Sequence, residues 1–346
     1  MNTFSLLKII IPTLKNKLIQ PHLDAPSPLR PPNLPEMSLN LFPSSAARMV
    51  PFGEAVFKVP VEEGEAKGAD EEETCKSTCS FPQSDHNLQK NIIDNRVKSL
   101  QYEANSPCED TLACDQLKHL DAFAISVFDG HGGAELAEYC RSKIHSFIDS
   151  YLLERLSSCA SVGEAIKESL RASYLRLEEA FFDTYEQQLK MGNKRIRSVG
   201  TCALTAVVHN DFVYLANAGD SQAVFLVSDG NGIRSVKGNE RLSVNSRSER
   251  ERLKREWLER DEEIVSEEGG VFYLKGRLQP TRTIGDYYLK KEQHFQGPGE
   301  FKGPYLTCLP DITEHKITAS HRYLVVASDG VWDALSKNQV AEALLR

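Results

Sequence analysis

The chain has 346 residues, of which 40% are hydrophobic and 26% charged, and these proportions are typical of a globular protein with an extensive core. The formal net charge of −8 argues against a protein that binds nucleic acid or docks on an anionic membrane, because both need a basic face. If the substrate is itself anionic, something other than lysine side chains must attract it, and a bound divalent metal ion would serve.

Residues 1–90 are predicted to be a disordered leader and linker before a folded domain at residues 91–346. Half of the 16 prolines lie within the first 50 residues, and residues 62–73 are acidic with mostly small side chains between the acids. The first 20 residues carry three lysines and no acid, which leaves a mitochondrial targeting segment open, but their apolar run is too short for a transmembrane segment. The eight cysteines form no Cys-x-x-Cys pair, so we expect an intracellular protein of the cytoplasm or nucleus.

The pattern of the sequence changes from about Asn95 onward, inside the predicted domain. Two long helices are predicted at 134–156 and 162–189, where apolar residues recur every three or four positions. Short apolar runs bounded by turn residues predict strands on both sides of these helices, at 122–128, 202–208, 212–216, 223–227, 271–274, 312–317 and 323–327. A charged surface helix at 246–264 and a last helix at 337–345 complete the pattern. Helices in one block between runs of strands indicate an α+β fold rather than a regular βαβ alternation.

Three of the apolar runs end in the same way, with an aspartate next to a glycine. "FAISVFDG" leads to Asp129, "FVYLANAGD" to Asp220, and "YLVVASDGVWD" to Asp329 with Asp333 four residues further on. A buried carboxylate is costly unless it has a partner, so we expect the three to share one. A hard divalent cation such as Mg²⁺ or Mn²⁺ would serve, because it takes oxygen ligands from carboxylates, carbonyls and water. Two such ions could activate a water and hold a phosphoryl group.

Each of these residues also has a simpler interpretation. An isolated Asp-Gly pair more often marks a tight turn, and we assign Asp229 in "VSDGNG" to such a turn. His131, two residues after Asp129, is either a loop histidine without a role or a general acid, because histidine titrates near neutral pH. A nucleotide-binding protein that uses the "DGHGG" loop is disfavoured, because the sequence has neither a Gly-x4-Gly-Lys-Ser/Thr motif nor a dinucleotide fingerprint.

Five segments, in this order and spacing, resemble those of the PPM-type (type 2C) metal-dependent protein serine/threonine phosphatases: "VFDGHGG", "SVGTCALTAVV", "VYLANAGDSQAV", "GRLQPTRTIGD" and "LVVASDGVWDAL". The resemblance covers about residues 95–346. It implies an antiparallel β-sandwich flanked by helices on both outer faces, in a four-layer α-β-β-α arrangement. It also implies hydrolysis of phosphoserine and phosphothreonine in phosphoprotein substrates by water that two Mg²⁺ or Mn²⁺ ions activate, with a third, weaker ion. We expect a monomer.

The resemblance implies metal-binding roles for the strand-end residues. Asp129 would bridge both ions, and Gly130 would add its carbonyl oxygen. Asp329 would bind one ion, whereas Asp220 and Asp333 would hold the third.

The remaining matches lie around these ligands. Asp129 and His131 would be the catalytic residues, with His131 protonating the leaving oxygen. In "ANSPCED", Glu109 and Asp110 match an acidic pair that lies near the metals, and Asn105 takes the place of a phosphate-binding arginine. The aspartate of "TIGD" belongs to a motif near the site but receives no role.

Two departures from the family pattern bear on activity. Asn105, with a proline two residues later, resembles the pyruvate dehydrogenase phosphatase branch, and its uncharged amide predicts weaker phosphate binding. The family's further aspartate, in an Asp-Asn motif on a late strand, has no counterpart before Arg346, so we expect a domain truncated at its carboxyl end. An alternative therefore stays open, namely a catalytically impaired pseudophosphatase or a regulatory scaffold that binds phosphoproteins without turnover.

Overall fold

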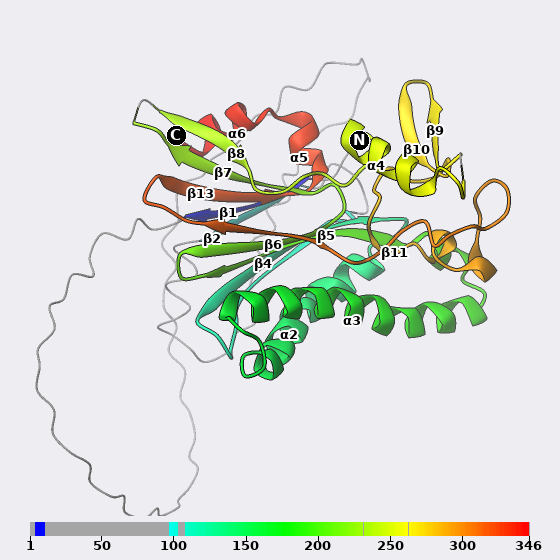
Figure 1. Cartoon of the computed structure of the whole chain (residues 1–346), viewed down its shortest axis with the longest axis horizontal. Coiled ribbons are helices and arrows are strands. Elements are labelled where there is room, and N and C mark those ends of the chain that lie inside the picture. Colours follow the sequence, from blue (N-terminus) through cyan, green and yellow to red (C-terminus); the bar gives the residue numbers. More distant parts are fainter. Residues whose placement is uncertain (1–3, 11–96, 103–107, 231, 262, 346) are drawn as a thin grey trace, which may run out of the picture. The chain divides into compact units, whose positions relative to one another are not determined.

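The structure, a computed structural model, describes residues 4–10, 97–102, 108–230, 232–261 and 263–345, and these form a mixed α/β fold with antiparallel sheets (Figure 1). The strands are β1 (Phe4–Ile10), β2 (Val97–Tyr102), β3 (Thr111–Gln116), β4 (Ala122–His131), β5 (Gly200–His209), β6 (Phe212–Ala218), β7 (Gln222–Ser228), β8 (Ile233–Lys237), β9 (Val265–Glu268), β10 (Val271–Leu274), β11 (Ile284–Gly285), β12 (Asp311–Lys316) and β13 (His321–Ala327). The helices are α2 (Glu135–Arg155), α3 (Val162–Lys190), α4 (Arg247–Trp257), α5 (Asp329–Ala334) and α6 (Lys337–Leu345), with short 3-10 helices η1 (Lys194–Ser198), η2 (Tyr287–Leu289) and η3 (Glu292–His294).

One sheet has the strand order β12-β6-β5-β4-β3, and β11 pairs with β5 beside it. β4 and β5 pair over their whole length, from Ala122 opposite His209 to His131 opposite Gly200. β6 also pairs antiparallel with β5, so β4 and β6 run in the same direction. The carboxyl ends of these two strands therefore lie at the same end of the sheet.

The other sheet has the order β2-β1-β13-β7-β8 and is also antiparallel. It corrects one prediction: residues 4–10 were expected in a disordered leader, but they form β1 between β2 and β13. The apolar run "FSLLKII" can complete the backbone hydrogen bonds along β13, with Leu6 opposite Ala327, and this pairing explains its order. Residues 11–90 of the predicted leader and linker lie outside the described residues.

Buried apolar side chains form clusters on both faces of the sheets. One cluster joins the facing sides of the two sheets and includes Ile125, Leu204 and Phe225. On the other side of the six-stranded sheet a second cluster packs against α2 and α3. A further cluster joins β7 and β13 to α5 and α6, which Figure 1 shows beside the five-stranded sheet. The strand ends that carry the aspartates are thus fixed by packing on both sides.

The two long helices form almost where their periodicity predicts them. Along α3 the residues Leu170, Tyr174, Leu177 and Phe181 recur at helical spacing and are all buried. Ser161 begins this helix as its N-cap, and its side-chain oxygen accepts a hydrogen bond from the backbone N–H of Glu164.

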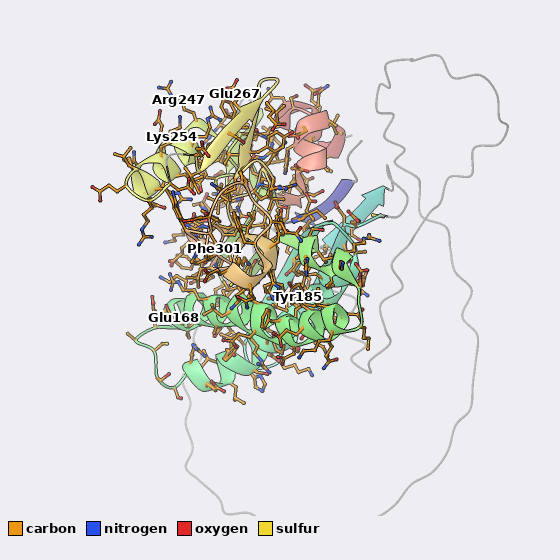
Figure 2. The ribbon with its side chains drawn as sticks, turned by 90° about the vertical axis from the view of Figure 1, so that its right-hand side faces the viewer. Glu168, Tyr185, Arg247, Lys254, Glu267 and Phe301 are labelled. Atoms are coloured by element: carbon orange, nitrogen blue, oxygen red, sulfur yellow. The ribbon has the colours of Figure 1, made fainter. Side chains whose placement is uncertain are left out.

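A smaller lobe is built from α4, β9, β10 and the chain that follows them, around a cluster that includes Leu253, Trp257 and Tyr305. Figure 2 shows this lobe, with Lys254 on α4, above α3. The predicted helix at 246–264 ends earlier, at Trp257, because Ile264 is itself buried in the cluster and the chain must turn to bring it there.

The other predicted strands and the last helix are confirmed within a few residues, while the strands β2, β3, β8, β9 and β11 and the short helix α5 were not predicted. In the part of the chain that the structure describes, none of the helices combines the length and the hydropathy that crossing a membrane requires.

Candidate active site

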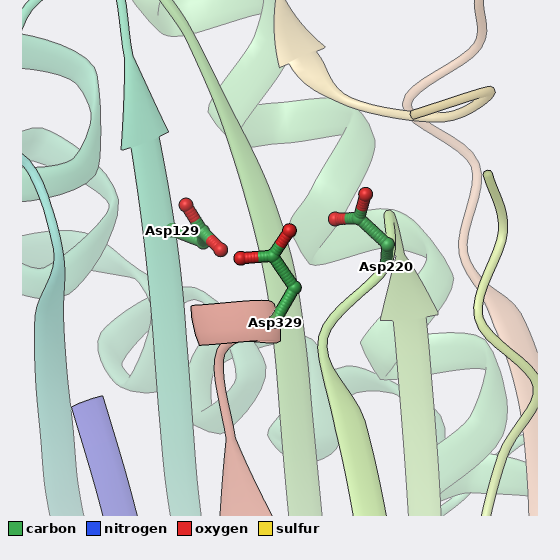
Figure 3. A group of neighbouring side chains, drawn as sticks. All are labelled: Asp129, Asp220 and Asp329. Carbon is green, nitrogen blue, oxygen red and sulfur yellow. The ribbon is translucent and has the colours of Figure 1, made fainter. Parts of the chain in front are cut away.

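Asp129, Asp220 and Asp329 converge at one end of the strands, as their sequence pattern predicts (Figure 3). Asp129 lies near the end of β4, Asp220 follows the end of β6 by two residues, and Asp329 follows β13 as the first residue of α5. Oxygen atoms of the three carboxylates lie within 4.8 Å of one another. The common direction of β4 and β6 brings two of them together, and packing of the sheets brings the third.

The cluster is short of positive charge. Burial, followed by the charges of Asp110, Asp329 and Asp220, raises the pKa of Asp129 well above its ordinary value. Burial and the charge of Asp329 raise the pKa of Asp220 to about 6, although a hydrogen bond from Cys202 and the charge of Arg241 oppose the change. The Arg241 guanidinium lies 3.6 Å from a carboxylate oxygen of Asp329, and one guanidinium cannot balance three carboxylates.

These residues fit a divalent metal ion. The donors are carboxylate oxygens, which Mg²⁺ and Mn²⁺ prefer. Burial first, and then the neighbouring carboxylates, raise the pKa values of Asp129 and Asp220, so a cation at the cluster would stabilise their charged forms. The side chain of Asp220 is oriented by the Cys202 thiol, which donates a hydrogen bond of 3.2 Å to Oδ1. The number and kind of ions stay a prediction.

The predicted acidic pair and Gly130 lie next to the cluster. Thr111 at the start of β3 pairs with Phe128, so Glu109 and Asp110, just before it, lie alongside the end of β4. A Cβ atom on Gly130 would clash with the carbonyl oxygen of Glu109, so this contact requires glycine. Their placement is compatible with metal ligation, and their roles as ligands stay predictions.

His131 is hydrogen-bonded to a residue that the sequence interpretation left without a role. Its Nε2 lies 2.8 Å from Oδ2 of Asp286, whose side chain is fully buried. Burial alone would lower the pKa of His131, but the Asp286 carboxylate raises it above its ordinary value. The hydroxyl of Thr283 donates a second hydrogen bond to the same oxygen. Gly200 lies against this pair, since a Cβ atom there would clash with both Oδ2 of Asp286 and Nε2 of His131.

The turn that carries Asp286 is held by α3. Glu178 of α3 accepts hydrogen bonds from the backbone N–H of Gly285 and from the Lys290 ammonium, both of 2.8 Å. Asp286 itself has a left-handed backbone conformation, with φ of 52°, that residues other than glycine rarely adopt. Strained residues of this kind cluster at functional sites, and their conformation is maintained by surrounding contacts.

Asp333 lies beside the cluster in contact with Arg241, which donates a hydrogen bond of 2.7 Å to its carboxylate. It is not among the three carboxylates that converge, so its role with a third ion stays a prediction. A second arginine, Arg195, donates a hydrogen bond to the carbonyl oxygen of Gly132 and lies 3.8 Å from Glu109. Asn105, the predicted phosphate-binding residue, lies outside the described residues.

The interpretation of the sequence gave no role to Asp286, Arg241 or Arg195, because their contacts join distant parts of the chain. The hydrogen bond between His131 and Asp286, for example, spans 155 positions. The signal available in the sequence was the position of Asp286 in a "TIGD" segment shared with the resembling family. The exposed Asp229 of "VSDGNG" forms a turn as predicted, and it accepts a hydrogen bond from the backbone N–H of Gly232.

Comparisons with known proteins agree with this geometry. Residues 80–345 match the family model described as Protein phosphatase 2C. One relative from Arabidopsis thaliana, "Probable protein phosphatase 2C 67", is 31% identical over 63% of this chain and 59% of its own length. Another from the same plant, "Probable protein phosphatase 2C 63", is 30% identical over 70% of this chain and 65% of its own length. The chain therefore spans about three fifths of the length of these relatives.

A crystal structure of a serine-threonine phosphatase 2C from Toxoplasma gondii is similar in fold, with a TM-score of 0.51 and 20% identity over 69% of this chain and 78% of that chain. These comparisons do not test the resemblance to the pyruvate dehydrogenase phosphatase branch, which stays a prediction.

Proposed function

Because the chain belongs to the protein phosphatase 2C family, we propose that it removes phosphate from phosphoserine and phosphothreonine side chains of proteins in a reaction that depends on Mg²⁺ or Mn²⁺. The observation that carries this proposal is the convergence of Asp129, Asp220 and Asp329. We also propose the α-β-β-α layer order of the family, which the apolar clusters on the outer sides of both sheets support.

The three aspartates would hold the metal ions. When bound, the ions would supply Lewis acidity toward the phosphoryl oxygens and lower the pKa of a water molecule. The chain's contribution is to fix the three carboxylates at the ends of separate strands, with oxygen atoms within 4.8 Å of one another. The partial burial of the cluster strengthens each electrostatic interaction there.

His131 would protonate the leaving oxygen of the serine or threonine. Asp286 accepts a hydrogen bond from Nε2, which leaves Nδ1 as the nitrogen that can give a proton to the substrate. Both nitrogens carry protons only in the charged form of the ring, and the Asp286 carboxylate favours that form by raising the pKa of His131. Asp286 would therefore both orient the ring and favour its protonated form.

The proposal is tested by phosphate release from a phosphothreonine peptide, with the full chain and increasing Mn²⁺. We expect release to depend on Mn²⁺, to stop in EDTA and to fall by about 100-fold or more in Asp129→Asn. The matched control is Asp229→Asn, which makes the same substitution in another Asp-Gly pair, one that lies in an exposed turn, and it should leave the rate unchanged. Release that persists in EDTA would contradict the proposed chemistry.

The pseudophosphatase or scaffold alternative predicts a different outcome of the same experiment. The chain would bind the phosphopeptide, but no phosphate would appear at any concentration of Mn²⁺ or Mg²⁺. Binding without turnover would therefore replace the enzymatic proposal with the scaffold.

A further inference from the structure

A pocket of about 550 Å³ lies beside the carboxylate cluster, between the segment that follows β8 and the connection from α5 to α6. Three of its lining residues are cations, Lys237, Arg241 and Lys337, and two are anions, Glu240 and Asp333. Three positive charges against two negative ones leave the pocket with one net positive charge. That sign is opposite to the formal net charge of −8 on the whole chain.

Arg241 connects this pocket to the candidate active site. One nitrogen of its guanidinium lies 2.7 Å from Asp333 in the pocket wall, and another lies 3.6 Å from Asp329 in the carboxylate cluster. A ligand held at the cluster would therefore have the pocket directly beside it. Each residue of an extended peptide advances about 3.3 Å, so a side chain only a few positions from the reacting one can reach the pocket.

The surplus positive charge belongs to Lys337. The Lys237 ammonium lies 2.9 Å from Glu240, and Arg241 is paired with Asp333, whereas no carboxylate of the described residues lies within ion-pair distance of Lys337. Burial and the charges of Lys237 and Arg241 lower the pKa of Lys337, and Glu240 opposes them only in part. A negative group between these cations would relieve their repulsion.

We propose that this pocket is a binding subsite for an anionic side chain of the substrate, either a carboxylate or a second phosphate group, close in sequence to the phosphorylated residue. The proposal rests on the proposed phosphatase function, and it extends that function by naming the substrate class: phosphoproteins whose sites have acidic or multiply phosphorylated surroundings. The cluster would act on the phosphate, while the pocket would select its neighbour.

The test compares phosphothreonine peptides of one length in the presence of Mn²⁺. One has neutral residues around the phosphothreonine, others carry one glutamate or one phosphoserine at each of three positions on either side, and a last group carries lysine there. We expect kcat/KM to be about fivefold higher for the best acidic peptide than for the neutral one. The advantage of the acidic peptide should shrink when the salt concentration is raised to about 0.5 M, because an ion pair near the surface is screened.

Charge reversal of the surplus cation provides the specific control. Lys337→Glu should abolish the preference for the acidic peptide and create one for the lysine peptide, an inversion that a damaged fold would not produce. The matched variant is Lys254→Glu, at an exposed position of α4 that does not line the pocket, which should leave both ratios unchanged.

The outcomes separate this inference from the proposed function. Equal kcat/KM for neutral and acidic peptides, or a preference that Lys337→Glu does not alter, would overturn the subsite while leaving the phosphatase intact. A preference for the phosphoserine peptides alone would identify the anion as phosphate, and a preference for both kinds would identify a general anion site. If no peptide is hydrolysed, fluorescence anisotropy of the same labelled peptides still decides the subsite: about fivefold tighter binding of the acidic peptide supports it, and equal binding refutes it.

Discussion

Replacing Asp220 by asparagine should stabilise the metal-free protein. The side chain is 4% exposed and lies near Asp329, and burial with the charge of that neighbour raises the pKa of Asp220 from 3.8 to about 6. The pKa of Asp220 in the folded chain therefore exceeds its ordinary value by about 2, and each pKa unit corresponds to about 1.4 kcal/mol. When the carboxyl is ionised, the folded chain is thus less stable by about 3 kcal/mol. The amide introduced by Asp220→Asn would keep an oxygen that can accept the hydrogen bond of the Cys202 thiol but would carry no charge.

The sign of this effect depends on pH. Because the pKa of Asp220 is higher in the folded than in the unfolded chain, the folded chain binds more protons between pH 3.8 and about 6. The free energy of unfolding of the metal-free wild type should therefore fall as the pH rises through this window. Asp220→Asn lacks this titration, so its advantage should be absent at pH below about 4 and complete above pH about 6.

The assay is urea unfolding of EDTA-treated protein at several pH values. We expect Asp220→Asn to be about 2 kcal/mol more stable than the wild type at neutral pH and of similar stability in acid. The gain is smaller than about 3 kcal/mol because the buried NH₂ group of the new amide loses hydrogen bonds to water. Asp183→Asn, at an exposed position of α3, is the matched control and should change the free energy of unfolding by less than about 0.5 kcal/mol. A destabilised or unchanged Asp220→Asn at neutral pH would refute the electrostatic account of the cluster.

Further predictions concern the residues around His131. Asp286→Asn should lower kcat about 10- to 100-fold and shift the alkaline limb of the pH profile of kcat to lower pH, because the carboxylate that raises the pKa of His131 is gone. An alkaline limb at the same pH as in the wild type would contradict this role of Asp286. Gly200→Ala should cause a similar loss, since the new Cβ would displace the same hydrogen bond, and the double variant with Asp286→Asn should be little worse than either single one. The control is Gly232→Ala, where a Cβ atom meets no neighbour within 4 Å, and it should retain wild-type kcat. If the losses of Gly200→Ala and Asp286→Asn instead add up in the double variant, the two positions act independently and the shared role is refuted.

The elements that the sequence predicts well are those whose pattern is local. The apolar spacing of α3 and the apolar runs of β5, β6 and β13 mark their positions within a few residues, because each buries a face with a fixed period. Strand β1 could not be predicted in this way. Its apolar run stands among lysines and far from the rest of the domain, and it becomes a strand through pairing with β13, at the opposite end of the chain.

The same distinction applies to the site. The three aspartates are visible in the sequence because each follows an apolar strand, and convergence follows once the strands pack. By contrast, no local pattern shows which residues contact His131 and Asp329. Asp286 reaches His131 from a turn held by Glu178, and Arg241 reaches Asp329 from the segment after β8, so both contacts follow from the tertiary fold alone.

The central claim, that three strand-end carboxylates form a divalent metal site, is tested most directly by anomalous X-ray diffraction at the manganese edge from crystals of the full chain soaked in Mn²⁺. We predict anomalous density in contact with the carboxylates of Asp129 and Asp329, and its loss in crystals of Asp129→Asn. Density confined to surface acids, with none between these residues, would contradict the claim.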